Sequence, residues 1–440
     1  MGIGGSGASA AAAIAEAQGF EVTGCDLEPN NEFTTQFKKS QLLTGHDPKH
    51  LASHSSSGNV DILAVTPAIF SLDPNNPELL EAKKKNIPVM TWQQFLGEYL
   101  TKDKFVITVC GTHGKTTTTA MIAKMLEDAG LDPTVELGAI VPWWGTNYRL
   151  PRQLGVDRHY FVMEADEFND NFLHLKPDIN VVTNIEMDHP EYFKDLEAVK
   201  ESFKKFLIQT KTVVANLSDP GVAEVMKVVM KTPHIQTSSD RGTFETYLDY
   251  SKNQLNFQLQ VPGQFNVLNA QAALQVGLLL GINPQVIQKS LAGYPGVGKR
   301  FEYIGEYQGA KIYSDFGHHP TEIKVTVEAA RQKFPNQRIL LIYQPHMFSR
   351  TKALFDDFVK VFRYLPADKA FILDIYPSRE IDTGLVTSKQ LVEAINKSSV
   401  SYIGEVNTAL EKIKPEIKSG DIVFFMSAGD TDKLAKELAE

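Results

Sequence analysis

An apolar strand followed by a glycine turn and a lysine lies near residue 110. The apolar run 106–110 leads into a turn and a helix start with the residues Gly111, Thr112, His113, Gly114, Lys115, Thr116 and Thr117. Backbone N–H groups at a helix N-terminus bind anions, the lysine can reach terminal phosphates and the Thr116 hydroxyl can bind Mg²⁺. Val109 stands where the generic loop has its first glycine, so we expect a shortened phosphate-binding loop. A chance Gly-x-x-Gly-Lys-Thr is the alternative.

A second glycine cluster opens the chain. Residues 2–7 satisfy Gly-x-Gly-x-x-Gly and precede a helix and an expected strand at 21–24 that ends near Asp26. This resembles half of a dinucleotide fingerprint, but the strand that should lead into the glycines is absent. The cluster therefore predicts either a tight structural turn or a site where backbone amides hold a nucleotide diphosphate. Its candidate residues are Gly4, Gly5, Ser6 and Gly7.

Two polar segments follow later strands of the same region. The acidic run 164–167 comes directly after the strand 159–163, and Asp188 and His189 follow the strand 180–184. A hard cation among triphosphate oxygens takes one or two protein ligands, carboxylates foremost, and an imidazole can supplement them. We expect Glu164 and His189 to help bind Mg²⁺. The alternative is a solvated acidic face and a histidine that caps a helix.

Histidines and an arginine follow two strands near the C-terminus. The segments 315–322 and 344–350 each come after a strand and open a helix, so their polar groups can converge on one ligand. His318 and His346 can exchange protons near neutral pH, and Arg350 can clamp a carboxylate. Paired histidines are also found as helix caps or in zinc sites, although no third zinc ligand has a suitable spacing.

Strands and helices alternate along the whole chain, which predicts an α/β fold with largely parallel sheets. The expected strands are 61–66, 105–110, 159–164, 179–184, 338–343, 370–375 and 421–426; the expected helices are 116–129, 196–209, 266–280, 320–334 and 352–362. The polar residues 100–104 and the glycine-rich segment 293–300 interrupt this alternation of strands and helices. We therefore expect three blocks: 1–100, 101–297 and 298–440.

Composition excludes several classes of protein. The 440 residues carry 44 basic and 53 acidic side chains, a net charge of −9, which disfavours nucleic acid and anionic membranes as partners. Two cysteines far apart indicate no disulfide framework, and no apolar run reaches the length of a membrane span. The N-terminus also lacks the features of a secretory signal, so we expect a cytoplasmic protein.

Taken together, these segments resemble the Mur ligase family over nearly the whole length. The resemblance rests on an ordered series of motifs: 2–7, 111–121, 164–167 with 172–177, 183–186 with Asp188 and His189, 262–270, 298–301, 317–322 and 344–346. It implies an N-terminal Rossmann-like domain for a UDP-sugar, a central ATPase and a C-terminal Rossmann-like domain for an amino acid. It also implies that ATP and Mg²⁺ activate the carboxylate of UDP-N-acetylmuramate as an acyl phosphate, which the amine of L-alanine attacks.

The resemblance further implies roles for individual residues. Phosphates and metal would be held by Lys115, Thr116, Glu164 and His189. The adenine would be contacted by Asn266 and Asn269, the phosphates also by Arg300 across the domain cleft, and the ribose by Asp315. The amino acid would be addressed by His318, His346 and Arg350. The UDP-sugar would be bound by the first glycine loop with Asp26 and Thr66. Among these, Lys115, His189, Arg300 and His318 are the candidate catalytic residues.

Departures from the family pattern leave the acceptor open. Phe316 replaces a tyrosine and Met347 replaces a frequent arginine, and losing a cation near the incoming carboxylate changes which acceptor is best recognised. A close rival is a peptidoglycan-recycling ligase that joins a tripeptide to UDP-N-acetylmuramate. A nicotinamide oxidoreductase and a non-catalytic scaffold that binds the UDP-sugar are two rivals from other classes. The oligomeric state, monomer or homodimer, also stays open.

Overall fold

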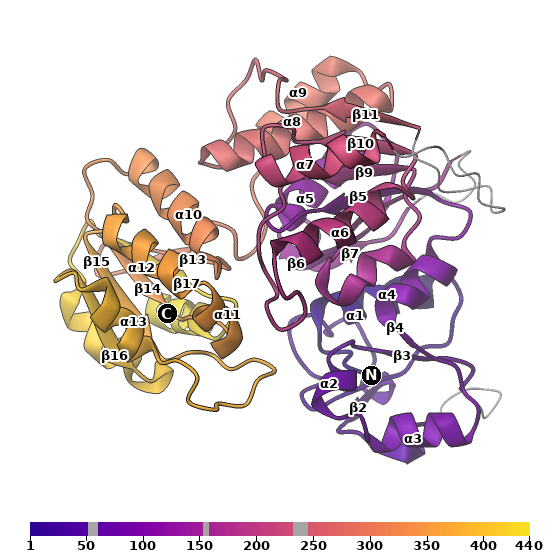
Figure 1. Cartoon of the computed structure of the whole chain (residues 1–440), viewed down its shortest axis with the longest axis horizontal. Helices are drawn as coiled ribbons and strands as arrows, with labels where there is room; N and C mark the ends of the chain where they lie inside the picture. Colours follow the sequence, from indigo (N-terminus) through magenta and orange to yellow (C-terminus); the bar gives the residue numbers. More distant parts are fainter. Residues whose placement is uncertain (52–59, 153–157, 232–244) are drawn as a thin grey trace. The chain divides into compact units, whose positions relative to one another are not determined.

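The computed structural model describes residues 1–51, 60–152, 158–231 and 245–440. The chain divides into two compact units (Figure 1). Unit 1 comprises Met1–Glu186, Glu197–Phe257 and Asn269–Ala292, and unit 2 comprises Met187–Leu196, Gln258–Leu268 and Gly293–Glu440. None of the helices in these described ranges combines the length and apolar character needed to cross a bilayer.

A seven-stranded sheet forms the centre of unit 1. Its strands lie in the order β11 (Thr246–Asp249), β10 (Thr212–Ala215), β9 (Ile179–Val182), β5 (Phe105–Cys110), β8 (Tyr160–Glu164), β6 (Thr134–Val141) and β7 (Thr146–Arg149). All neighbours are parallel except β6 and β7, which form an antiparallel edge. The central strand β5 is buried along almost its whole length, as an apolar strand covered on both faces must be.

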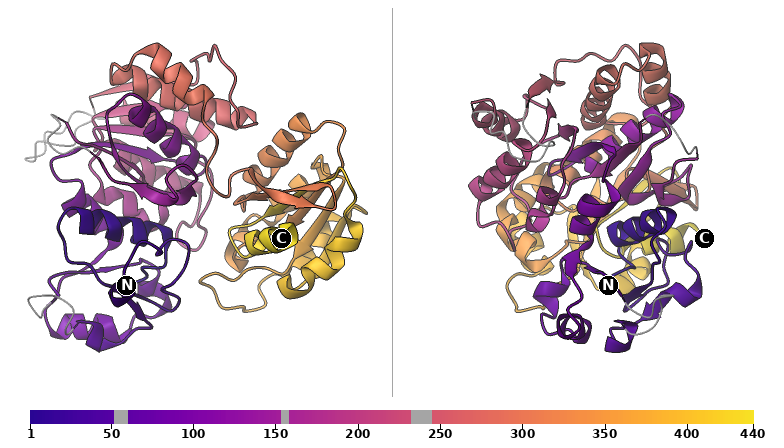
Figure 2. Two further views of the ribbon diagram at one scale, coloured as in Figure 1. Left: turned by 180° about the vertical axis from the view of Figure 1, so that it is seen from behind. Right: turned by 90° about the vertical axis from the view of Figure 1, so that its right-hand side faces the viewer.

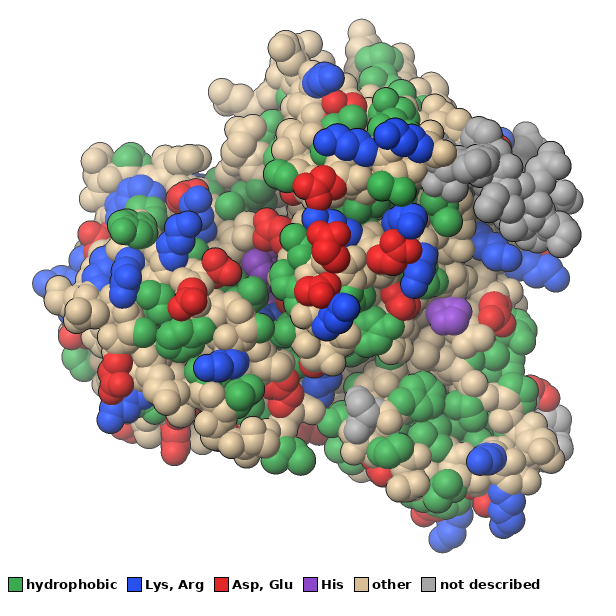
Figure 3. All heavy atoms as spheres, in the orientation of Figure 1, with side chains coloured by type: hydrophobic (Ala, Val, Ile, Leu, Met, Phe, Trp, Pro, Cys, Tyr) green, Lys and Arg blue, Asp and Glu red, His purple; other side chains and the backbone are tan. Residues whose placement is uncertain are grey.

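Helices surround this sheet: α5 (Lys115–Asp128), which packs on β5, β6 and β8, α6 (Leu196–Leu207), α7 (Pro220–Val229), α8 (Gln264–Leu279) and α9 (Pro284–Ala292), which packs on α5. On α6, the apolar residues Val199, Phe203 and Phe206 are buried, while the opposite face carries charge pairs such as Lys200–Glu197 and Lys204–Glu201. Acidic and basic side chains are accordingly interspersed on the face drawn in Figure 3.

The N-terminal part of unit 1 contains two separate sheets of two parallel strands. β1 (Gly24–Asp26) pairs with β2 (Leu42–Thr44), and β3 (Leu63–Val65) pairs with β4 (Val89–Thr91). The helices here are α1 (Ser6–Ala17), α2 (Ile69–Leu72), α3 (Pro77–Lys84) and α4 (Trp92–Phe95), with 3-10 turns at Lys39–Gln41 and Pro48–Leu51. Tyr148 of β7 packs against Ile3 and Ala13, which joins α1 to the central sheet.

A buried carboxylate contacts several polar side chains in the N-terminal part of unit 1. The Glu78 side chain, 1% exposed, accepts a hydrogen bond from the Cys25 thiol at 3.1 Å and contacts His50 Nδ1 at 2.6 Å and His46 Nδ1 at 3.3 Å. Burial raises the pKa of the Cys25 thiol to about 12. The second cysteine, Cys110 in β5, is fully buried, and burial likewise raises its thiol pKa to about 12.

Unit 2 is built on a six-stranded sheet in the order β12 (Glu302–Tyr307), β13 (Ala310–Asp315), β17 (Ile422–Met426), β14 (Ile339–Tyr343), β15 (Lys369–Leu373) and β16 (Val400–Gly404). Only β12 runs antiparallel to its neighbour. The helices are α10 (Pro320–Lys333), α11 (Phe348–Ala353), α12 (Phe355–Tyr364), α13 (Ser388–Ile395), α14 (Ala409–Ile413) and α15 (Thr431–Ala439), and they lie on both faces (Figure 2).

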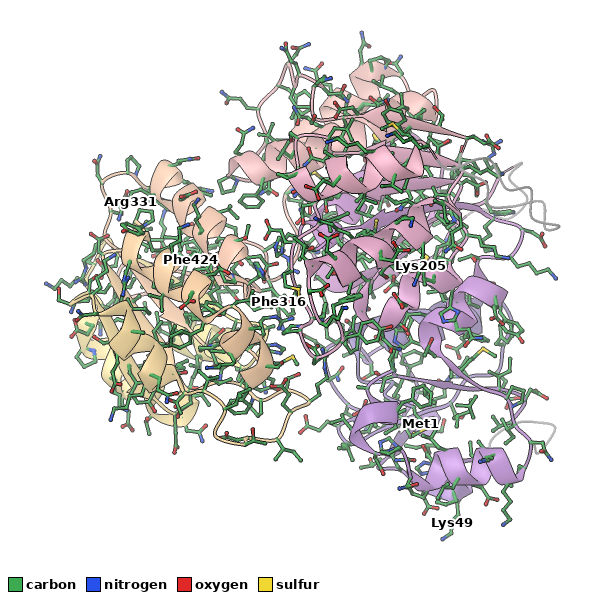
Figure 4. The ribbon with its side chains drawn as sticks, in the orientation of Figure 1. Met1, Lys49, Lys205, Phe316, Arg331 and Phe424 are labelled. Atoms are coloured by element: carbon green, nitrogen blue, oxygen red, sulfur yellow. The ribbon has the colours of Figure 1, made fainter. Side chains whose placement is uncertain are left out.

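Strand alternation divides the core of unit 2 into two layers. Phe424 belongs to the layer that contains Phe358, whereas its neighbour Phe425 belongs to the layer on the other face with Ala435. Figure 4 labels Phe424 within the sheet and Arg331 near the end of α10. The predicted α/β fold with largely parallel sheets is therefore confirmed.

Element boundaries differ from the sequence-based expectation by a few residues at several places, and two of the differences have a clear structural reason. The helix expected at 352–362 is two helices, because Leu354 has non-helical dihedral angles and separates α11 from α12. The strand expected at 21–24 begins only at Gly24, where the backbone enters register with Leu42 of β2.

Candidate active site

The predicted phosphate-binding loop at residues 111–117 connects β5 to α5 in unit 1. Gly111 has φ of +135°, and a Cβ there would lie 2.0 Å from Thr183 Oγ1. Gly114 has φ of +83°, and a Cβ there would lie 2.7 Å from Asn269 Oδ1. Both positions therefore require glycine for conformation and for space. The same contact brings Asn269, predicted from the sequence to touch adenine, to the phosphate loop.

Residues after β9 hold the loop in shape. Asn184 accepts the His113 N–H on its side-chain oxygen at 2.8 Å and the Thr112 N–H on its carbonyl at 3.1 Å. The Thr183 hydroxyl donates to the His113 carbonyl at 2.6 Å, and the Thr112 hydroxyl accepts the Glu186 N–H at 2.9 Å. The loop is thus pre-formed. Sequence reasoning did not assign Thr183 and Asn184 to the site, because this role depends on a contact between distant parts of the chain.

The lysine of the loop is buried and ion-paired. Lys115 Nζ lies 2.9 Å from Glu167 Oε2 and donates to the Gly111 carbonyl at 2.6 Å. Burial alone would lower its pKa, but the charges of Glu167 and nearby carboxylates outweigh it and hold the pKa above its usual value. Lys115 therefore stays cationic, and Thr116 and Thr117 follow it in the buried first turn of α5. A helix N-terminus and an ammonium group at one place suit a polyanion.

Glu164 ends β8 beside the loop. It pairs in register with Val109 of β5, and its Oε1 accepts the Gly138 N–H at 2.6 Å. Burial and the Glu164 charge raise the pKa of the neighbouring Glu136 well above its usual value, so the neutral form of Glu136 is favoured. A carboxylate at the carboxyl edge of the sheet, together with the Thr116 hydroxyl, is a donor set that fits Mg²⁺ bound to phosphate oxygens.

His189 lies in a different unit from Glu164. In unit 2 its backbone has φ of +53°, its N–H donates to Asp188 Oδ1 at 2.8 Å and its Nδ1 lies 3.2 Å from Glu191 Oε1. Glu191 also pairs with Arg379. The shared metal site of Glu164 and His189 accordingly stays a prediction.

The two polar segments after β13 and β14 come together in unit 2, at the carboxyl edge of the sheet. The rings of His318 and His346 have centroids 5.7 Å apart, and His346 Nδ1 lies 3.0 Å from Arg350 Nη1. Arg350 is 2% exposed and donates through Nε to Asp188 Oδ1 at 2.8 Å. Met347, also buried, places its sulfur 3.9 Å from Arg350 Nη1. The predicted carboxylate clamp is thus already paired with an acid of the protein.

Electrostatics keep this cluster in a defined charge state. Burial lowers the pKa of His318 to about 4, and burial with the His318 and Arg350 charges lowers the pKa of His346 to about 2. Burial opposes the charge of Asp188, but the facing His189 and Arg350 hold its pKa well below the usual value. At neutral pH His318 and His346 are therefore neutral, while Asp188 and Arg350 are charged.

The remaining residues predicted to contact the nucleotide, Asn266, Arg300 and Asp315, all lie in unit 2. Asp315 accepts the N–H groups of Phe301 and Gly317, each at 2.8 Å, and burial raises its pKa to about 6. The Arg300 guanidinium lies 4.6 Å from the centre of the Phe316 ring, labelled in Figure 4. Asn266 donates from its side chain to the Pro262 carbonyl at 2.7 Å.

Side chains from distant parts of unit 1 contact the N-terminal glycine loop. Asp26 Oδ2 accepts the Gly4 N–H at 2.9 Å, so this carboxylate holds the loop itself. A Cβ on Gly7 would lie 2.3 Å from Trp92, and the Ser6 carbonyl accepts from Asn147 at 2.5 Å. Sequence reasoning did not find the roles of Trp92 and Asn147, which are distant along the chain. Gly5 precedes α1 as its N-cap residue, and Thr66 contacts the position where Gly2 would carry a Cβ.

Comparison with known proteins assigns this arrangement to a family. Three family models match successive segments: "Mur ligase family, catalytic domain" at 1–104, "Mur ligase middle domain" at 109–277 and "Mur ligase, glutamate ligase domain" at 299–429. A UDP-N-acetylmuramate-L-alanine ligase of Aquifex aeolicus is 36% identical over 454 residues, covering 99% of this chain and 96% of that protein. The chain belongs to the Mur ligase family. It is accordingly an enzyme of the ATP-dependent ligase class, and the resemblance inferred from its motifs is confirmed.

Further relatives support the assignment of this chain to the Mur ligase family. A UDP-N-acetylmuramate-L-alanine ligase of Alkaliphilus metalliredigens is 35% identical over 458 residues, covering 100% of this chain and 96% of that protein. The crystal structure of a UDP-N-acetylmuramate-alanine ligase from Thermotoga maritima matches with a TM-score of 0.75 at 24% identity, covering 99% of this chain and 96% of that one. A murein peptide ligase from Psychrobacter arcticus matches with a TM-score of 0.68 at 22% identity and the same coverage. These structural matches concern the fold.

Proposed function

We propose that this Mur ligase joins L-alanine to the lactyl carboxylate of UDP-N-acetylmuramate, with ATP as the energy source, in the synthesis of peptidoglycan precursors. The observation that carries the proposal is a pre-formed phosphate loop with a buried, cationic Lys115, in a chain similar along its whole length to L-alanine ligases. We further propose that the blocks 1–100, 101–297 and 298–440 act as UDP-sugar, ATP and amino-acid domains. A cytoplasmic location stays a prediction from the sequence.

The chemistry follows from the poor reactivity of a carboxylate. One carboxylate oxygen would attack the γ-phosphorus, the bond to ADP would break, and an acyl phosphate would form. The amine of L-alanine would then attack the acyl carbon, a C–N bond would form, and inorganic phosphate would leave while the amine loses a proton. Activation is needed because a carboxylate has no good leaving group until its oxygen carries phosphate.

Residues of unit 1 would carry the phosphoryl step. Lys115 would exchange its contact with Glu167 for the γ-phosphate and offset the charge that develops there. Bound Mg²⁺ would supply further charge neutralisation, held by Thr116 and Glu164, with His189 as a proposed additional ligand. The N–H groups at the start of α5 would orient the phosphates.

Residues of unit 2 would position the acceptor. His318 and His346 are neutral at pH 7 and can accept hydrogen bonds from an amine. Arg350 is paired with Asp188 through Nε, so we propose that it shapes the acceptor pocket. We further propose that it binds a carboxylate only through Nη1, the atom that faces His346. Arg300 and Asp315 would contact the nucleotide.

A single assay tests the proposal and separates it from the tripeptide ligase. Phosphate release is measured with ATP, Mg²⁺ and UDP-N-acetylmuramate, without acceptor and with L-alanine, L-serine, glycine or L-Ala-γ-D-Glu-diaminopimelate. Release that needs both the UDP-sugar and L-alanine supports the proposal. Release that needs the tripeptide identifies the recycling ligase instead. Release that ignores both the UDP-sugar and the acceptor contradicts the ligase assignment.

A further inference from the structure

Four side chains with metal-binding atoms converge in the N-terminal part of unit 1: Cys25, His46, His50 and Glu78. Cys25 Sγ lies 3.1 Å from Glu78 Oε2 and 3.6 Å from His46 Nδ1. His46 Nδ1 lies 3.3 Å from the same Oε2 atom, and His50 Nδ1 lies 2.6 Å from the other carboxylate oxygen, Oε1. None of these residues belongs to the phosphate-binding loop or to the cluster around Arg350.

The distances match the spacing of ligands around a small tetrahedral ion. Atoms bound about 2.0 to 2.3 Å from a tetrahedral zinc lie about 3.3 to 3.6 Å from one another. The distances from His46 Nδ1 to Cys25 Sγ and to Glu78 Oε2, 3.6 and 3.3 Å, fall in this range. The contacts of Glu78 with Cys25 and His50 are shorter because they have the lengths of hydrogen bonds. The ligand atoms of Cys25, His50 and Glu78 also lie within 4.8 Å of one another.

The pairing of β1 with β2 places Cys25 beside His46. Cys25 is the middle residue of β1 and pairs in register with Leu43 of β2. The Asp26 carbonyl accepts the Gly45 N–H at 2.8 Å, which continues the pairing up to the residue before His46. The backbone therefore fixes the spacing between the thiol and the first imidazole.

A 3-10 turn and the start of α3 position the other two side chains. His50 lies in the turn Pro48–Leu51. Three residues separate it from His46, a spacing found between the histidines of zinc sites. Glu78 lies in the first turn of α3, where the Asn76 side chain accepts its N–H at 3.0 Å. The four side chains thus come from three elements that are far apart in the sequence, and no local motif predicts their convergence.

The charges of this group balance around a divalent ion. Only 1% of the Glu78 side chain is exposed, and among the described residues its ion-pair partners are His46 and His50, with no lysine or arginine. Burying a carboxylate is costly unless a cation compensates for its charge. A divalent ion bound to the Glu78 carboxylate, the Cys25 thiolate and two neutral imidazoles leaves the buried group with no net charge.

The ligand atoms also select the kind of ion. Mg²⁺ and Ca²⁺ prefer oxygen ligands, whereas thiolate and imidazole ligands favour Zn²⁺ and related transition metals. One sulfur, two nitrogens and one carboxylate oxygen fill the four positions of tetrahedral zinc and leave none for a substrate, as in structural sites. An ion has access, since the His46 and His50 side chains are 19% and 17% exposed and a cavity of about 460 Å³ is lined by Cys25, His50 and Glu78.

We propose that Cys25, His46, His50 and Glu78 form a structural zinc site. Binding would release the Cys25 thiol proton to solvent, and each imidazole would bind through Nδ1 and carry its proton on Nε2. Glu78 would bind through Oε2, and His50 Nδ1 would exchange its contact with Oε1 for the ion. The ion would then take the place of the hydrogen bonds that now join the four side chains.

Such an ion would fasten β1, the 3-10 turn and α3 to one another. The three elements already share a small apolar core that contains Cys25, Leu51 and Ala82. Asp26, the neighbour of Cys25, accepts the Gly4 N–H at 2.9 Å, so a firmer β1 would also steady the N-terminal glycine loop. This inference goes beyond the proposed ligase activity, because the site touches neither nucleotide nor acceptor in the proposed mechanism.

A cobalt titration of the full chain tests the proposal, because Co²⁺ replaces Zn²⁺ in tetrahedral sites and absorbs light strongly when a thiolate binds it. The metal-free chain is titrated with Co²⁺ in the absence of nucleotide, and Zn²⁺ is then added as a competitor. We expect a thiolate-to-cobalt absorption band that saturates at one ion per chain and a Kd for Zn²⁺ below about 1 µM. Cys25→Ser should remove the band, and Cys110→Ser, which changes the other buried thiol, should keep it.

The other ligands are tested by the affinity for Zn²⁺. His46→Gln, His50→Gln and Glu78→Gln should each weaken binding by more than about 100-fold, since losing a ligand costs more than losing a residue that supports one. His174→Gln, which changes an exposed histidine, should leave the affinity unchanged. Zn²⁺ should also raise the thermal midpoint of the unmodified chain by about 3 °C or more, but not that of Cys25→Ser.

Three results would overturn the proposal: a Kd for Zn²⁺ above about 1 µM, a thiolate band that survives Cys25→Ser, or an affinity unchanged by any of the three other ligand variants. The four side chains would then be joined by protons alone, or the ion would be bound elsewhere. The titration of the unmodified chain decides the first point even if a variant fails to fold. Because no readout uses ATP or turnover, a failure of the proposed ligase activity leaves this test unaffected.

Discussion

The ammonium nitrogen of Lys115 lies 2.9 Å from a carboxylate oxygen of Glu167, in a position where only 16% of the lysine side chain and 3% of the glutamate side chain are exposed. Glu167 thus holds the lysine over the loop until an anion competes for it. The pair explains how a buried cation persists beside a helix N-terminus, which by itself repels positive charge. In the proposed mechanism, this is the contact that the nucleotide displaces.

Replacing this lysine should abolish the phosphoryl step. We expect Lys115→Ala to lower the rate of phosphate release by at least about 100-fold, the scale of losing a principal electrostatic contact in the transition state. Lys124→Ala is the matched control, because Lys124 lies on the same helix and pairs with Asp128 at the surface. Near-normal turnover of the Lys115 variant would contradict the loop assignment.

Glycine at position 114 should matter for space as well as for conformation. Gly114→Ala and Gly130→Ala both place a side chain at positive φ, but a Cβ meets Asn269 Oδ1 at 2.7 Å in the first and nothing within 4 Å in the second. Each should lose about 1 kcal/mol of stability from strain. Only Gly114→Ala should weaken ATP binding by about tenfold or more in calorimetry. Equal ATP affinities would show that the contact with Asn269 is unimportant.

Arg350 and Asp188 should be energetically coupled. Arg350→Met should lower the free energy of unfolding by about 3 to 5 kcal/mol, since it leaves the buried Asp188 carboxylate without its guanidinium partner. The double variant with Asp188→Leu should lose less than the sum of the two single variants. Urea unfolding of the four chains measures this coupling, and strictly additive losses would argue against it.

The imidazole of His318 should resist protonation. Burial lowers its pKa from 6.5 to about 4, so its contribution to stability is complete above about pH 6.5 and is lost as the pH falls through 4. We expect the ¹³C-labelled His318 resonance, assigned with His318→Asn, to show no titration between pH 7 and pH 5. A midpoint at or above pH 6 would mean that the nearby Glu322 carboxylate, 3.4 Å from His318 Nδ1, outweighs the effect of burial.

The sequence predicts the parts of this fold that depend on local pattern. Apolar runs locate β5, β8, β14 and β17, and the glycine spacing locates the loop that precedes Lys115. What it misses depends on contacts between distant residues: the antiparallel edge strands β7 and β12, the Asn184 side chain that supports His113, and the packing of Trp92 on Gly7. Helical periodicity also continues through Leu354, although the backbone does not.

For the site, sequence pattern identifies groups of residues but not their partners. His318, His346 and Arg350 are predicted to lie together, and the structure brings them together in unit 2. Nothing in the sequence around Arg350 indicates that Asp188, 162 positions away, is its partner. The charge state of such a cluster therefore depends on the three-dimensional arrangement.

Both cysteines of this chain are shielded, Cys25 at 4% and Cys110 at 0% exposure, and their thiols are protonated at neutral pH. Maleimide dyes react with exposed thiolates, so they should leave the folded chain unmodified. A cysteine introduced on the surface of α6 and another on α15 would then be the sole attachment points for a donor and an acceptor dye. Single-molecule energy transfer could follow the distance between the two units as ATP, UDP-sugar and amino acid are added in turn, without first removing a native thiol.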